Sequence, residues 1–591
     1  MKNSISDKHN INSKYYQWIV FGIICLGLIS LYSRWIMTER LPFIMDELVD
    51  TQIGYQVGKG FKIYSELEWE RTPLMTFLIS AITKSSQSSF ITVVLARKLM
   101  WFGTAIIFFL TYFIARQVNG SYTAVLALLL LCGFTTFLDR SIRIRADLIS
   151  TLFSLPGLWA VTSYSLHPLF LGFAGFFLGL AVLTTQKAVY FVVAFAVALV
   201  GRMIILSGLN SQSMKKIGMN SLIATAGFAL PIISFLALIL FSGRMEQFLA
   251  QCFFHAAKAG LISDTYSYTT GYLWQTVLRN PTVWCLGLAG IFILLFEGIK
   301  NKGNPSLEEK KTETIGPGIA LSLWTLSMLV LILQHTVKFP YLYLNIAPSL
   351  AICASLPLGR IIFFIITQKR RLNWTHIVSA VLCLFLLLIL PFFHHKKNLN
   401  IDLIKAQSAI MNRVDSITSQ EDAVFDGIGI AVTRKKATPY SMTKRWSDER
   451  KAGANYNIIK SLKKTQPKVL IWNYRMKHLR KDERVFIDSH FVLDWANVYV
   501  VGTTIFHDGP NPTKKTINLL SSSEYAILAT DRQKIRIDGN IPGPVEFLTA
   551  GDHEVVIDGE GQKLQLKYFP AVKILPPPPQ KRFNLFPLYS D

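Results

Sequence analysis

The sequence has few charged residues for its length. Of its 591 residues, 17% are charged and 51% are hydrophobic, whereas soluble domains carry about 25% charged residues. The apolar residues are also gathered into long runs. This composition excludes a soluble enzyme, a disordered chain and a disulfide-stabilised secreted scaffold, and it indicates a protein that crosses a membrane several times.

Acidic residues and C-terminal cysteines are also scarce. The 61 basic residues outnumber the 37 acidic ones, which gives a net charge of +24. In a membrane protein, cytoplasmic loops and contacts with anionic membrane lipids account for this excess, so we expect no nucleic-acid partner. No cysteine follows Cys383, so we expect no disulfide in the polar C-terminal region. The chain also lacks a Gly-rich nucleotide loop and a Rossmann glycine pattern, which argues against a nucleotide-activated donor.

About eleven apolar segments approach the roughly 20 residues that a membrane-spanning helix needs. They lie at residues 17–37, 92–114, 121–138, 148–165, 168–186, 188–206, 218–241, 281–299, 317–334, 342–366 and 374–393. The first follows a Lys-containing tail without a small-residue cleavage site, so we expect an uncleaved anchor. The apolar stretch 73–83 has only about half the required length, and we expect it to form a helix at the outer interface.

The distribution of Lys and Arg predicts the orientation. Alternate loops are basic, which places the N-terminus in the cytoplasm of a multi-pass protein of the inner (plasma) membrane. The residues that support this are Arg116, Arg202, Lys215, Lys216, Lys300, Lys302, Lys310, Lys311, Arg360, Lys369, Arg370 and Arg371. Lys84, Arg97 and Lys98 then lie outside, against the rule, but they are outnumbered. An odd number of spans makes the domain after residue 395 extracytoplasmic.

The predicted fold class is an α-helical polytopic membrane protein with a C-terminal mixed α/β or β-rich domain. Residues 1–395 form the membrane module, with an outer loop at 38–72, and residues 396–591 form the outer domain. Strand-like runs lie at Lys468–Trp472, Val498–Thr504, Lys534–Asp538, Glu554–Asp558 and Lys563–Tyr568. The period-two alternation at 535–538 and 564–567 suits half-buried antiparallel strands. The part at about 520–570 is predicted to form a small β-sandwich, and Pro576–Pro579 is predicted to form a stiff spacer.

The outer loop carries a pair of carboxylates, Asp46 and Glu47, followed by Tyr55 and Tyr64. Apolar residues recur every four positions from Val49, which predicts a short amphipathic helix at 47–58 on the membrane surface. Asp46 would then cap the helix, where its carboxylate accepts backbone N–H bonds. Composition alone favours this structural role over a catalytic one.

Cations collect at the predicted outer face. Arg140, Arg143, Arg145 and Asp147 lie between the third and fourth spans, and Lys187, His335 and Lys338 lie at the same level. A single such residue is more often an interfacial anchor. Several together favour an anionic ligand such as a lipid-linked phosphate, which Arg binds in a bidentate fork. Because Arg143 and Arg145 would point apart on a helix, we expect a non-helical connection around residues 139–146, with Asp147 pairing with one Arg or capping the next helix.

These motifs resemble the C-type (GT-C) membrane glycosyltransferases. The Asp-Glu pair, the later Tyr and Gly residues and the element Arg71-Thr72-Pro73-Leu74 are most similar to the group of protein O-mannosyltransferases and lipid A aminoarabinose transferases. Arg143-Ile144-Arg145-Ala146-Asp147 fits that group's Arg-Asp element, and His335 to Tyr343 with Pro348 fits its late basic-aromatic-Pro segment. The resemblance covers roughly residues 15–395. Where the group usually has Lys-Pro-Pro-Leu, this chain has Arg71-Thr72, which puts the acceptor pocket in doubt.

The resemblance implies a transferase that uses a polyprenyl-phosphate sugar donor and a lipid, glycan or protein acceptor. Asp46 would act as the general base or orient the acceptor, and Glu47 would position the sugar or the acceptor. The implied substrate-binding residues are Tyr55, Tyr64, Arg71, Arg143, Arg145, Asp147, Lys187, His335, Lys338 and Tyr341. If the acceptor were itself a phosphate, no base would be needed and Asp46 would only orient it.

Other functions remain open at this stage. A transporter or flippase for an envelope lipid could use the same charges, but it usually carries them near the midplane and shows internal symmetry. A non-catalytic assembly factor is a third possibility. His255 and the pair His394-His395 lack a spaced set of partners, so we expect no metal site and no cofactor, although the sequence leaves a divalent ion open.

Overall fold

The structure is a computed structural model. It describes residues 13–254, 271–300, 308–335, 338–367, 399–451, 453–574 and 581–587. The chain divides into two compact units. Unit 1 contains residues 1–40, 70–75 and 97–399, and unit 2 contains residues 41–69, 76–96 and 400–591. Each unit is described separately below.

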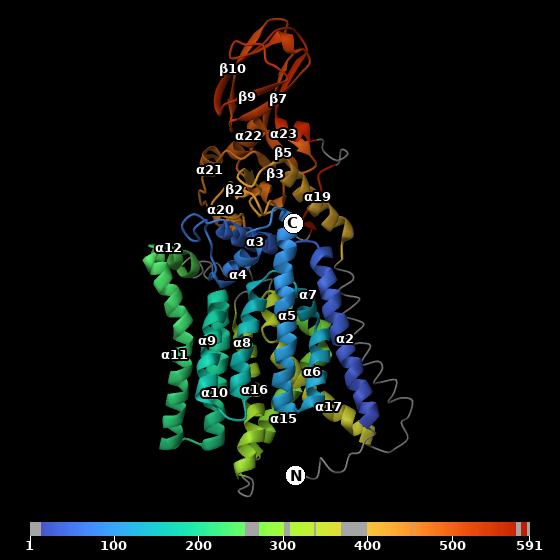
Figure 1. The fold of residues 1–591 in the computed structure, drawn as a ribbon, viewed down its shortest axis with the longest axis vertical. Coiled ribbons are helices and arrows are strands. Elements are labelled where there is room, and N and C mark those ends of the chain that lie inside the picture. Colours follow the sequence, from blue (N-terminus) through green and yellow to red (C-terminus); the bar gives the residue numbers. More distant parts are fainter. Residues whose placement is uncertain are drawn as a thin grey trace. The chain divides into compact units, whose positions relative to one another are not determined.

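Unit 1 is helical, and most of its helices coincide with predicted spans (Figure 1). They are α2 (Ser13–Arg40), α5 (Ser89–Asn119, from Arg97), α6 (Ser121–Gly133), α7 (Thr135–Arg140), α8 (Ala146–Thr162), α9 (Pro168–Thr184), α10 (Val189–Ser207), α11 (Ser211–Phe241), α15 (Pro281–Lys300), α16 (Glu308–Gln334) and α17 (Ala347–Thr367). Among the described residues, five helices are long and apolar enough to cross a membrane, and several shorter apolar helices accompany them. The predicted polytopic membrane architecture is therefore confirmed.

Short elements connect these helices. They are the 3-10 turns η1 (Gln186–Ala188) and η6 (Pro340–Leu344), the helices α12 (Met245–Leu249) and α14 (Gly271–Arg279), and the π-turn η2 (Ala250–Phe254). The predicted span 342–366 thus begins with η6 before α17. The predicted span 374–393, His255, His394-His395 and Pro576–Pro579 lie outside the described residues.

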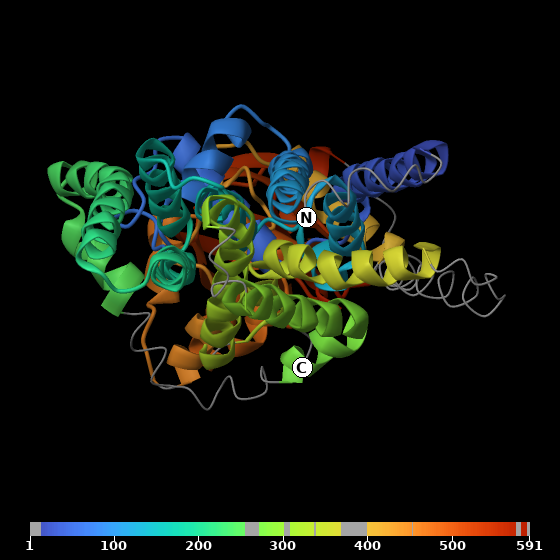
Figure 2. The same cartoon turned by 90° about the horizontal axis from the view of Figure 1, so that it is seen from below.

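Small residues bring the helices of unit 1 together. Figure 2 shows the helices from below, and α9 packs along both α8 and α11. A Cβ added at Gly175 of α9 would lie 2.0 Å from the backbone oxygen of Ala224 on α11. The same holds for Gly290 of α15, where a Cβ would lie 2.0 Å from the Cys353 oxygen of α17. Such close backbone approach is how helices gain packing energy where lipid offers no hydrophobic driving force.

The predicted span 121–138 is broken, because α6 ends at Gly133 and α7 begins at Thr135. Asn280, which precedes α15, forms hydrogen bonds with the backbone groups that are left free at this break. Its Nδ2 donates to the Gly133 oxygen at 2.9 Å, and its Oδ1 accepts from the Thr135 nitrogen at 2.7 Å. A helix can be interrupted at membrane depth only when another group satisfies the freed backbone atoms, and Asn280 does so here.

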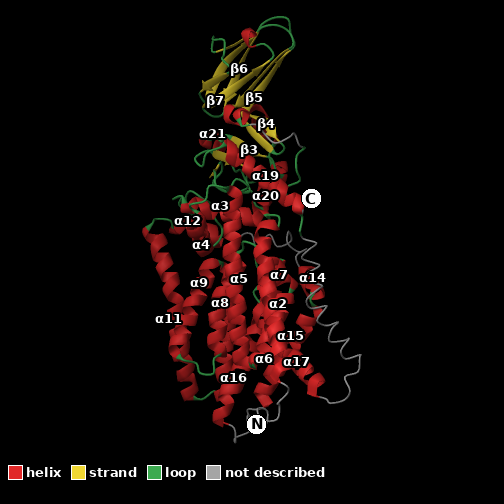
Figure 3. Cartoon of the chain, turned by 45° about the vertical axis from the view of Figure 1, so that its right-hand side comes forward, coloured by secondary structure: helices red, strands yellow, loops and turns green. Residues whose placement is uncertain are grey.

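Unit 2 combines helices with two sheets, and Figure 3 shows its strands in yellow. Its helices are α3 (Met45–Gly58), α4 (Leu74–Thr83, from Thr76), the first turns of α5, α19 (Ile401–Ile417), α20 (Lys444–Lys451), α21 (Ile458–Thr465), α22 (Lys481–His490) and α23 (Phe569–Lys573), with 3-10 turns η7 (Tyr474–His478) and η8 (Arg532–Lys534). The strands are β1 (Ala423–Phe425), β2 (Lys435–Lys436), β3 (Val469–Ile471), β4 (Phe491–Trp495), β5 (Val498–His507), β6 (Thr513–Leu519), β7 (Ser523–Ala529), β8 (Ile535–Ile537), β9 (Val545–Leu548), β10 (Gly551–Ile557) and β11 (Gln562–Tyr568).

The eight-stranded sheet has the order β2-β1-β3-β5-β11-β7-β9, with β4 also paired to β5. The first three strands are parallel, and the pairings from β3 onward are antiparallel. A separate three-stranded sheet has the order β6-β10-β8. The five predicted strands correspond to β3, β5, β8, β10 and β11, so the period-two pattern is confirmed. The sequences of the remaining strands show no clear alternation of apolar and polar residues.

Unit 2 joins the first outer loop to the C-terminal domain. Gln56 Nε2 on α3 donates to the Arg434 oxygen at 2.7 Å, and Gln407 of α19 accepts from the Phe43 nitrogen at 2.8 Å. Residues 41–69 and 400–591 therefore belong to one compact unit, as the prediction that both face the same side of the membrane requires. The stretch predicted to be an interfacial helix at 73–83 is α4, whose ten residues are too few to cross a membrane.

Candidate active site

The two units share the predicted site residues between them. Unit 2 holds Asp46, Glu47, Tyr55 and Tyr64. Unit 1 holds Arg71, Arg143, Arg145, Asp147, Lys187, His335, Lys338 and Tyr341. Each group is described within its own unit.

Asp46 does not cap α3, contrary to the prediction. The helix begins at Met45 after the N-cap residue Ile44, which places Asp46 in the first turn. Glu47 supplies the cap instead, because its Oε2 accepts from the Ile44 nitrogen at 3.1 Å. Asp46 therefore does not cap the helix, although the positive end of the helix dipole still stabilises its negative charge.

The prediction that this helix is amphipathic and lies on the membrane surface is also wrong. Every residue of α3 from Glu47 to Gln56 is buried. Within unit 2, α4 lies so close that a Cβ at Gly54 would be 2.5 Å from Cγ2 of Ile79. On another side, a Cβ at Gly429 would be 2.9 Å from the Leu48 oxygen. Because α3 is packed on several sides, its first turn keeps Asp46 in a fixed position.

Asp46 lies within electrostatic reach of Tyr474, and Arg475 contacts the neighbouring Met45, with 3.9 Å from its guanidinium to the sulfur. Burial raises the pKa of Tyr474, Arg475 lowers it, and Asp46 raises it. The Tyr474 hydroxyl is 3.0 Å from the sulfur of Met45, and the guanidinium carbon of Arg475 is 4.8 Å from the Tyr474 ring centre. Sequence reasoning missed both residues, because nothing in their local pattern links them to the outer loop.

Tyr55 and Tyr64 are core residues of unit 2, each with 1% of its surface exposed. The Tyr55 hydroxyl donates to the Ser86 oxygen at 3.2 Å. Tyr64 has a backbone φ of 74°, and its nitrogen donates to the Leu67 oxygen at 2.8 Å. Both rings therefore belong to the packed interior of the outer loop.

In unit 1, the connection before α8 is non-helical at residues 141–145, as predicted. Arg145 has an extended backbone, with φ −149° and ψ 136°. Its Nε lies 3.3 Å from Oδ2 of Asp147, and its guanidinium carbon lies 3.4 Å from the ring centre of Tyr341. The predicted pairing of Asp147 with an arginine is therefore present. Arg143 is half-buried on the same connection.

Lys187 lies against Tyr341, and Lys187, Lys338 and Asp147 lie within electrostatic reach of His335. Lys187 Nζ lies 4.7 Å from the Tyr341 ring centre. The Nδ1 atom of His335, one residue beyond α16, is 2.8 Å from the Tyr190 hydroxyl. Burial lowers the pKa of His335 to about 4, Lys187 and Lys338 act in the same direction, and Asp147 opposes them. We call Arg145, Asp147, Lys187, His335, Lys338 and Tyr341 the cationic cluster.

Arg71 belongs to a segment that is tied to the start of η1. The Thr72 hydroxyl donates to the Val182 oxygen at 3.0 Å, and Gln186 Nε2 donates to the Glu70 oxygen at 2.9 Å. Because Gln186 precedes Lys187 directly, this segment runs beside the element that carries one of the cations. Arg71 itself is half-buried.

Several buried polar atoms near the cationic cluster have no hydrogen-bond partner among the described residues. They are Oδ1 of Asp147, Nε2 of His335, the Tyr343 hydroxyl and Nδ2 of Asn345. The Thr151 hydroxyl links two of these residues, since it contacts the Asp147 backbone oxygen at 2.8 Å and Oδ1 of Asn345 at 3.0 Å. Unpaired buried polar atoms are costly. Their concentration here indicates a polar ligand, and Asn345, Tyr343 and Thr151 were not predicted.

The part of the chain that the structure describes contains no group of three or more His, Cys, Asp or Glu residues that could hold a metal ion. Arg145, Lys187 and Lys338 of the cationic cluster are cations, which suit an anionic ligand.

The chain was compared with known proteins at three levels. No protein-family model and no curated protein sequence matches it. Among solved structures, ArnT from Cupriavidus metallidurans in the apo state has a TM-score of 0.53 at 12% identity, covering 82% of this chain and 98% of that one. The same protein bound to undecaprenyl phosphate has a TM-score of 0.52 at 12% identity, with 81% and 98% covered.

The oligosaccharyltransferase AglB from Archaeoglobus fulgidus, in complex with an inhibitory peptide and a dolichol-phosphate, is also similar. It has 13% identity over 78% of this chain and 70% of that one, but its TM-score of 0.47 is too low to carry weight. The likeness to ArnT spans almost the whole of that protein, and at this identity it shows the fold alone. The chain therefore has the fold of the C-type (GT-C) membrane glycosyltransferases, as its sequence motifs predicted.

Proposed function

We propose that the protein is a membrane glycosyltransferase that moves a sugar from a polyprenyl-phosphate donor to a hydroxyl group of an acceptor at the outer face of the membrane. The observation that carries this proposal is the cationic cluster, in which Arg145, Lys187 and Lys338 are grouped with Asp147. Buried polar atoms beside it have no hydrogen-bond partner among the described residues. ArnT, which has this fold, has been solved with undecaprenyl phosphate. This supports a lipid-phosphate donor here.

In the proposed reaction, the bond between the anomeric carbon and the phosphate oxygen breaks. Its electron pair goes to the phosphate, and the acceptor oxygen forms a new bond to that carbon. The cations of unit 1 would stabilise the departing phosphate, which is the largest development of charge in the step. Arg145 is already oriented by Asp147 and stacked on Tyr341, so little reorganisation is needed at the moment of transfer.

In unit 2, Asp46 would take the proton of the acceptor hydroxyl. It is half-buried at the first turn of a rigid helix and is not used as a helix cap. A carboxylate is the group that general-base assistance to a hydroxyl requires. Glu47 has a different task, because its carboxylate holds the Ile44 nitrogen and so fixes the helix start.

Binding of the donor's phosphate tests the role of the cationic cluster. We would measure the affinity of the purified protein for undecaprenyl phosphate, with undecaprenol, which has the same chain but no phosphate, as the matched lipid. We expect the wild-type protein to prefer the phosphate, and Lys187→Gln to lose this preference without changing undecaprenol binding. Equal binding of the two lipids by the wild-type protein would contradict the proposal.

Substitution of Asp46 tests the chemistry. We expect Asp46→Asn to lower the rate of sugar transfer about 10²–10⁴-fold, because the amide cannot accept the proton. Asp402→Asn is the matched control, since Asp402 occupies the equivalent first-turn position of α19 and is exposed. Both variants lose a similar helix-dipole interaction of about 0.3–1 kcal/mol. Asp46 would be removed from the mechanism if both variants transferred sugar equally well.

Labelling tests the orientation. Single cysteines at Glu66 and Lys481, both exposed in unit 2, would be treated with a membrane-impermeant maleimide in intact cells. We expect both to react, because the proposal places unit 2 outside. Reaction only after the cells are broken would reverse the orientation and would exclude an outer-face enzyme.

A further inference from the structure

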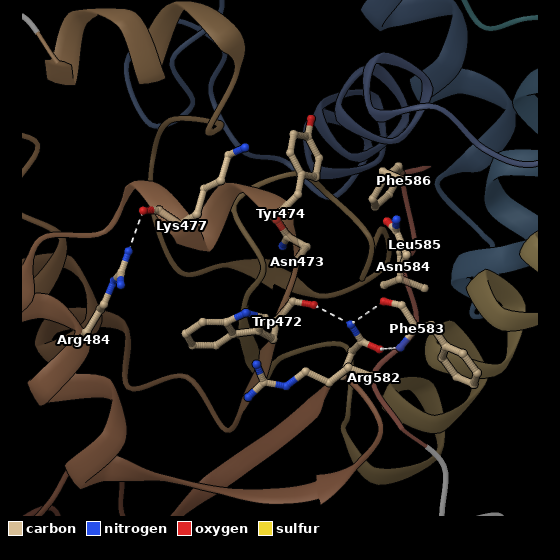
Figure 4. A pocket seen from close by; sticks show the side chains of 11 residues that line it. Trp472, Asn473, Tyr474, Lys477, Arg484, Arg582, Phe583, Asn584, Leu585 and Phe586 are labelled. Carbon is tan, nitrogen blue, oxygen red and sulfur yellow. Dashed lines mark hydrogen bonds between the residues drawn. The ribbon is translucent and has the colours of Figure 1, made fainter. Parts of the chain in front are cut away.

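Unit 2 contains a cavity that neither the cationic cluster nor the proposed chemistry of Asp46 accounts for. Its volume is about 410 Å³, and Figure 4 shows the side chains around it. Three parts of the unit line it: the segment from Trp472 to Lys477 after β3, Arg484 on α22 with Asn497 before β5, and the segment 582–586 near the C-terminus.

The lining of this cavity is basic, aromatic and amide-bearing. Three of its eleven residues are cations (Lys477, Arg484 and Arg582), and none is acidic. Arg582 is ordered by aromatic rings, since its guanidinium carbon lies 4.8 Å from the Trp472 ring centre and 5.2 Å from that of Tyr499. It also donates to the Tyr499 hydroxyl. These groups favour a ligand that has both a negative charge and a face that can stack.

The walls of the cavity are held in place by hydrogen bonds. Asn497 Nδ2 donates to the Trp472 oxygen at 2.9 Å and to the Phe583 oxygen at 3.1 Å, and its Oδ1 accepts from the Phe583 nitrogen at 2.7 Å. Arg484 donates to the Lys477 oxygen. One side chain thus ties the segment after β3 to the segment 581–587, so the cavity is preformed.

Positive charge surrounds this end of unit 2. Burial lowers the pKa of His478 to about 4, and Arg475, Lys451 and Lys477 lower it further, while Asp448 opposes them. Arg475 is only 8% exposed, and its Nε has no hydrogen-bond partner among the described residues. An anion in the cavity would compensate this excess of positive charge.

The cavity also lies beside the start of α3. Tyr474, one of its lining residues, approaches the Met45 sulfur to 3.0 Å and is within electrostatic reach of Asp46. The ring centres of Tyr474 and Phe586 are 5.8 Å apart, which links the same wall to the C-terminal segment. A ligand in the cavity would therefore have one end near the carboxylate that the proposed function assigns to the acceptor.

We propose that this cavity binds an anionic sugar of the acceptor, with the ring stacked on Trp472 or Tyr474 and its carboxylate or phosphate held by Lys477 or Arg582, whose charged ends lie apart in Figure 4. This inference rests on the proposed function, because it names the chemical class of the acceptor that Asp46 would activate. Cations in fixed positions and flat aromatic faces are the two features that recognise such a residue.

Three probes with the same sugar ring test the proposal: glucuronate, glucose 6-phosphate and glucose. Their binding to the full-length protein in detergent would be followed by saturation-transfer NMR. We expect the two anionic sugars to bind and glucose to bind at least about tenfold more weakly. The stronger of the two anionic probes identifies a carboxylate or a phosphate. Equal binding of all three, or binding of none, overturns the proposal.

Variants separate the cavity from the rest of unit 2. We expect either Lys477→Gln or Arg582→Gln, whichever removes the cation that holds the anion, to weaken the binding of the anionic probes by about tenfold or more. Lys460→Gln, at an exposed lysine on α21 that does not line the cavity, should leave it unchanged. Asp46→Asn should also still bind the probes. Cation variants that bind like the wild-type protein would overturn the assignment.

The same probes distinguish the two proposals. Glucuronate or glucose 6-phosphate should inhibit sugar transfer without weakening the binding of undecaprenyl phosphate. If transfer depends on Asp46 but neither probe binds, the proposed function stands and the cavity inference fails. If the probes bind at the cavity but Asp46→Asn transfers normally, the proposed role of Asp46 fails and the cavity remains a site for an anionic sugar.

Discussion

The two units treat buried charge differently. In unit 2, three buried arginines pair with carboxylates. Arg413 lies 2.7 Å from Asp494, Arg434 lies 3.2 Å from Asp415, and Arg450 pairs with Glu483. In unit 1, the cationic cluster groups Arg145, Lys187 and Lys338 with Asp147, and buried polar atoms beside it have no hydrogen-bond partner among the described residues.

This difference distinguishes charged residues that stabilise the fold from charged residues that are available to bind a ligand. A buried ion pair with complete hydrogen bonding has a structural role, because removing one partner greatly lowers the stability of the fold. Buried polar atoms that lack a partner in the described part of the chain, beside grouped cations, have no such structural explanation, and such groups are typical of functional sites. The following predictions test this distinction, from the largest expected effect to the smallest.

Loss of a structural arginine should have the largest effect on stability. Arg413 donates to both oxygens of Asp494 and to the carbonyl oxygens of Ala571 and Ile574. We expect Arg413→Met to lower the free energy of unfolding by about 3 kcal/mol or more, because it leaves Asp494 buried without this partner. Urea denaturation of the full-length protein would measure the change. Lys435→Met, which breaks the exposed pair with Glu421, should cost less than about 1 kcal/mol.

Loss of a cluster arginine should instead affect donor binding. Arg145→Lys keeps the charge but loses the bidentate fork, so we expect undecaprenyl phosphate to bind more weakly without being lost. Arg145→Gln should weaken binding further, by about 2 kcal/mol or more, because a partly desolvated phosphate loses its counter-charge. Arg143→Lys and Arg143→Gln would be measured beside them. If all four variants bound the lipid like the wild-type protein, these arginines would be membrane anchors, and the phosphate site would have to be sought around Lys187 and Lys338.

Asn280 provides an intermediate case, a neutral polar group in unit 1 whose hydrogen bonds are satisfied. Asn280→Ala frees the Gly133 oxygen and the Thr135 nitrogen at the break between α6 and α7. We expect a loss of about 1–3 kcal/mol of stability, which is the cost of leaving such groups unpaired. Thermal denaturation in detergent would show it. An unchanged midpoint would mean that water or lipid replaces the side chain.

The smallest effect concerns the pair His553–Asp538 in unit 2, whose Nδ1 and Oδ2 atoms are 2.6 Å apart. The hydrogen bond from His553 lowers the pKa of Asp538. Burial acts to lower the pKa of His553, but Asp538 and the Thr549 carbonyl outweigh it, and the pKa is raised above 6.5.

The sign of the pH dependence follows from these directions. The histidine's contribution to stability is complete below about pH 6.5 and disappears as the pH rises through its raised pKa. The contribution of Asp538 is complete above about pH 3.9 and disappears as the pH falls through its lowered pKa. The pair is therefore strongest between roughly pH 4 and 6.5. NMR titration should show a lower His553 pKa in Asp538→Asn, and an unchanged titration curve would exclude the pairing.

The helical membrane architecture could be predicted because lipid imposes a simple rule of length and hydropathy. Most predicted spans coincide with helices of unit 1, and the five predicted strands of unit 2 are present. The failures have specific causes. The break at Phe134 depends on Asn280, about 145 residues away in the chain, and no local pattern signals it. The position of Asp46 was misjudged because Glu47, not Asp46, caps α3.

By itself, the sequence determined the membrane-spanning character of the chain, the order of its charged motifs and the candidate residues of the cationic cluster. These follow from residue type and spacing along one segment. Only the tertiary structure decided that the first outer loop belongs to the C-terminal unit, that α3 is buried, and that Tyr474 and Arg475 lie near Asp46. Such contacts join residues more than 400 positions apart, as between Met45 and Tyr474. Packing between distant segments selects them, and local periodicity carries no record of that packing.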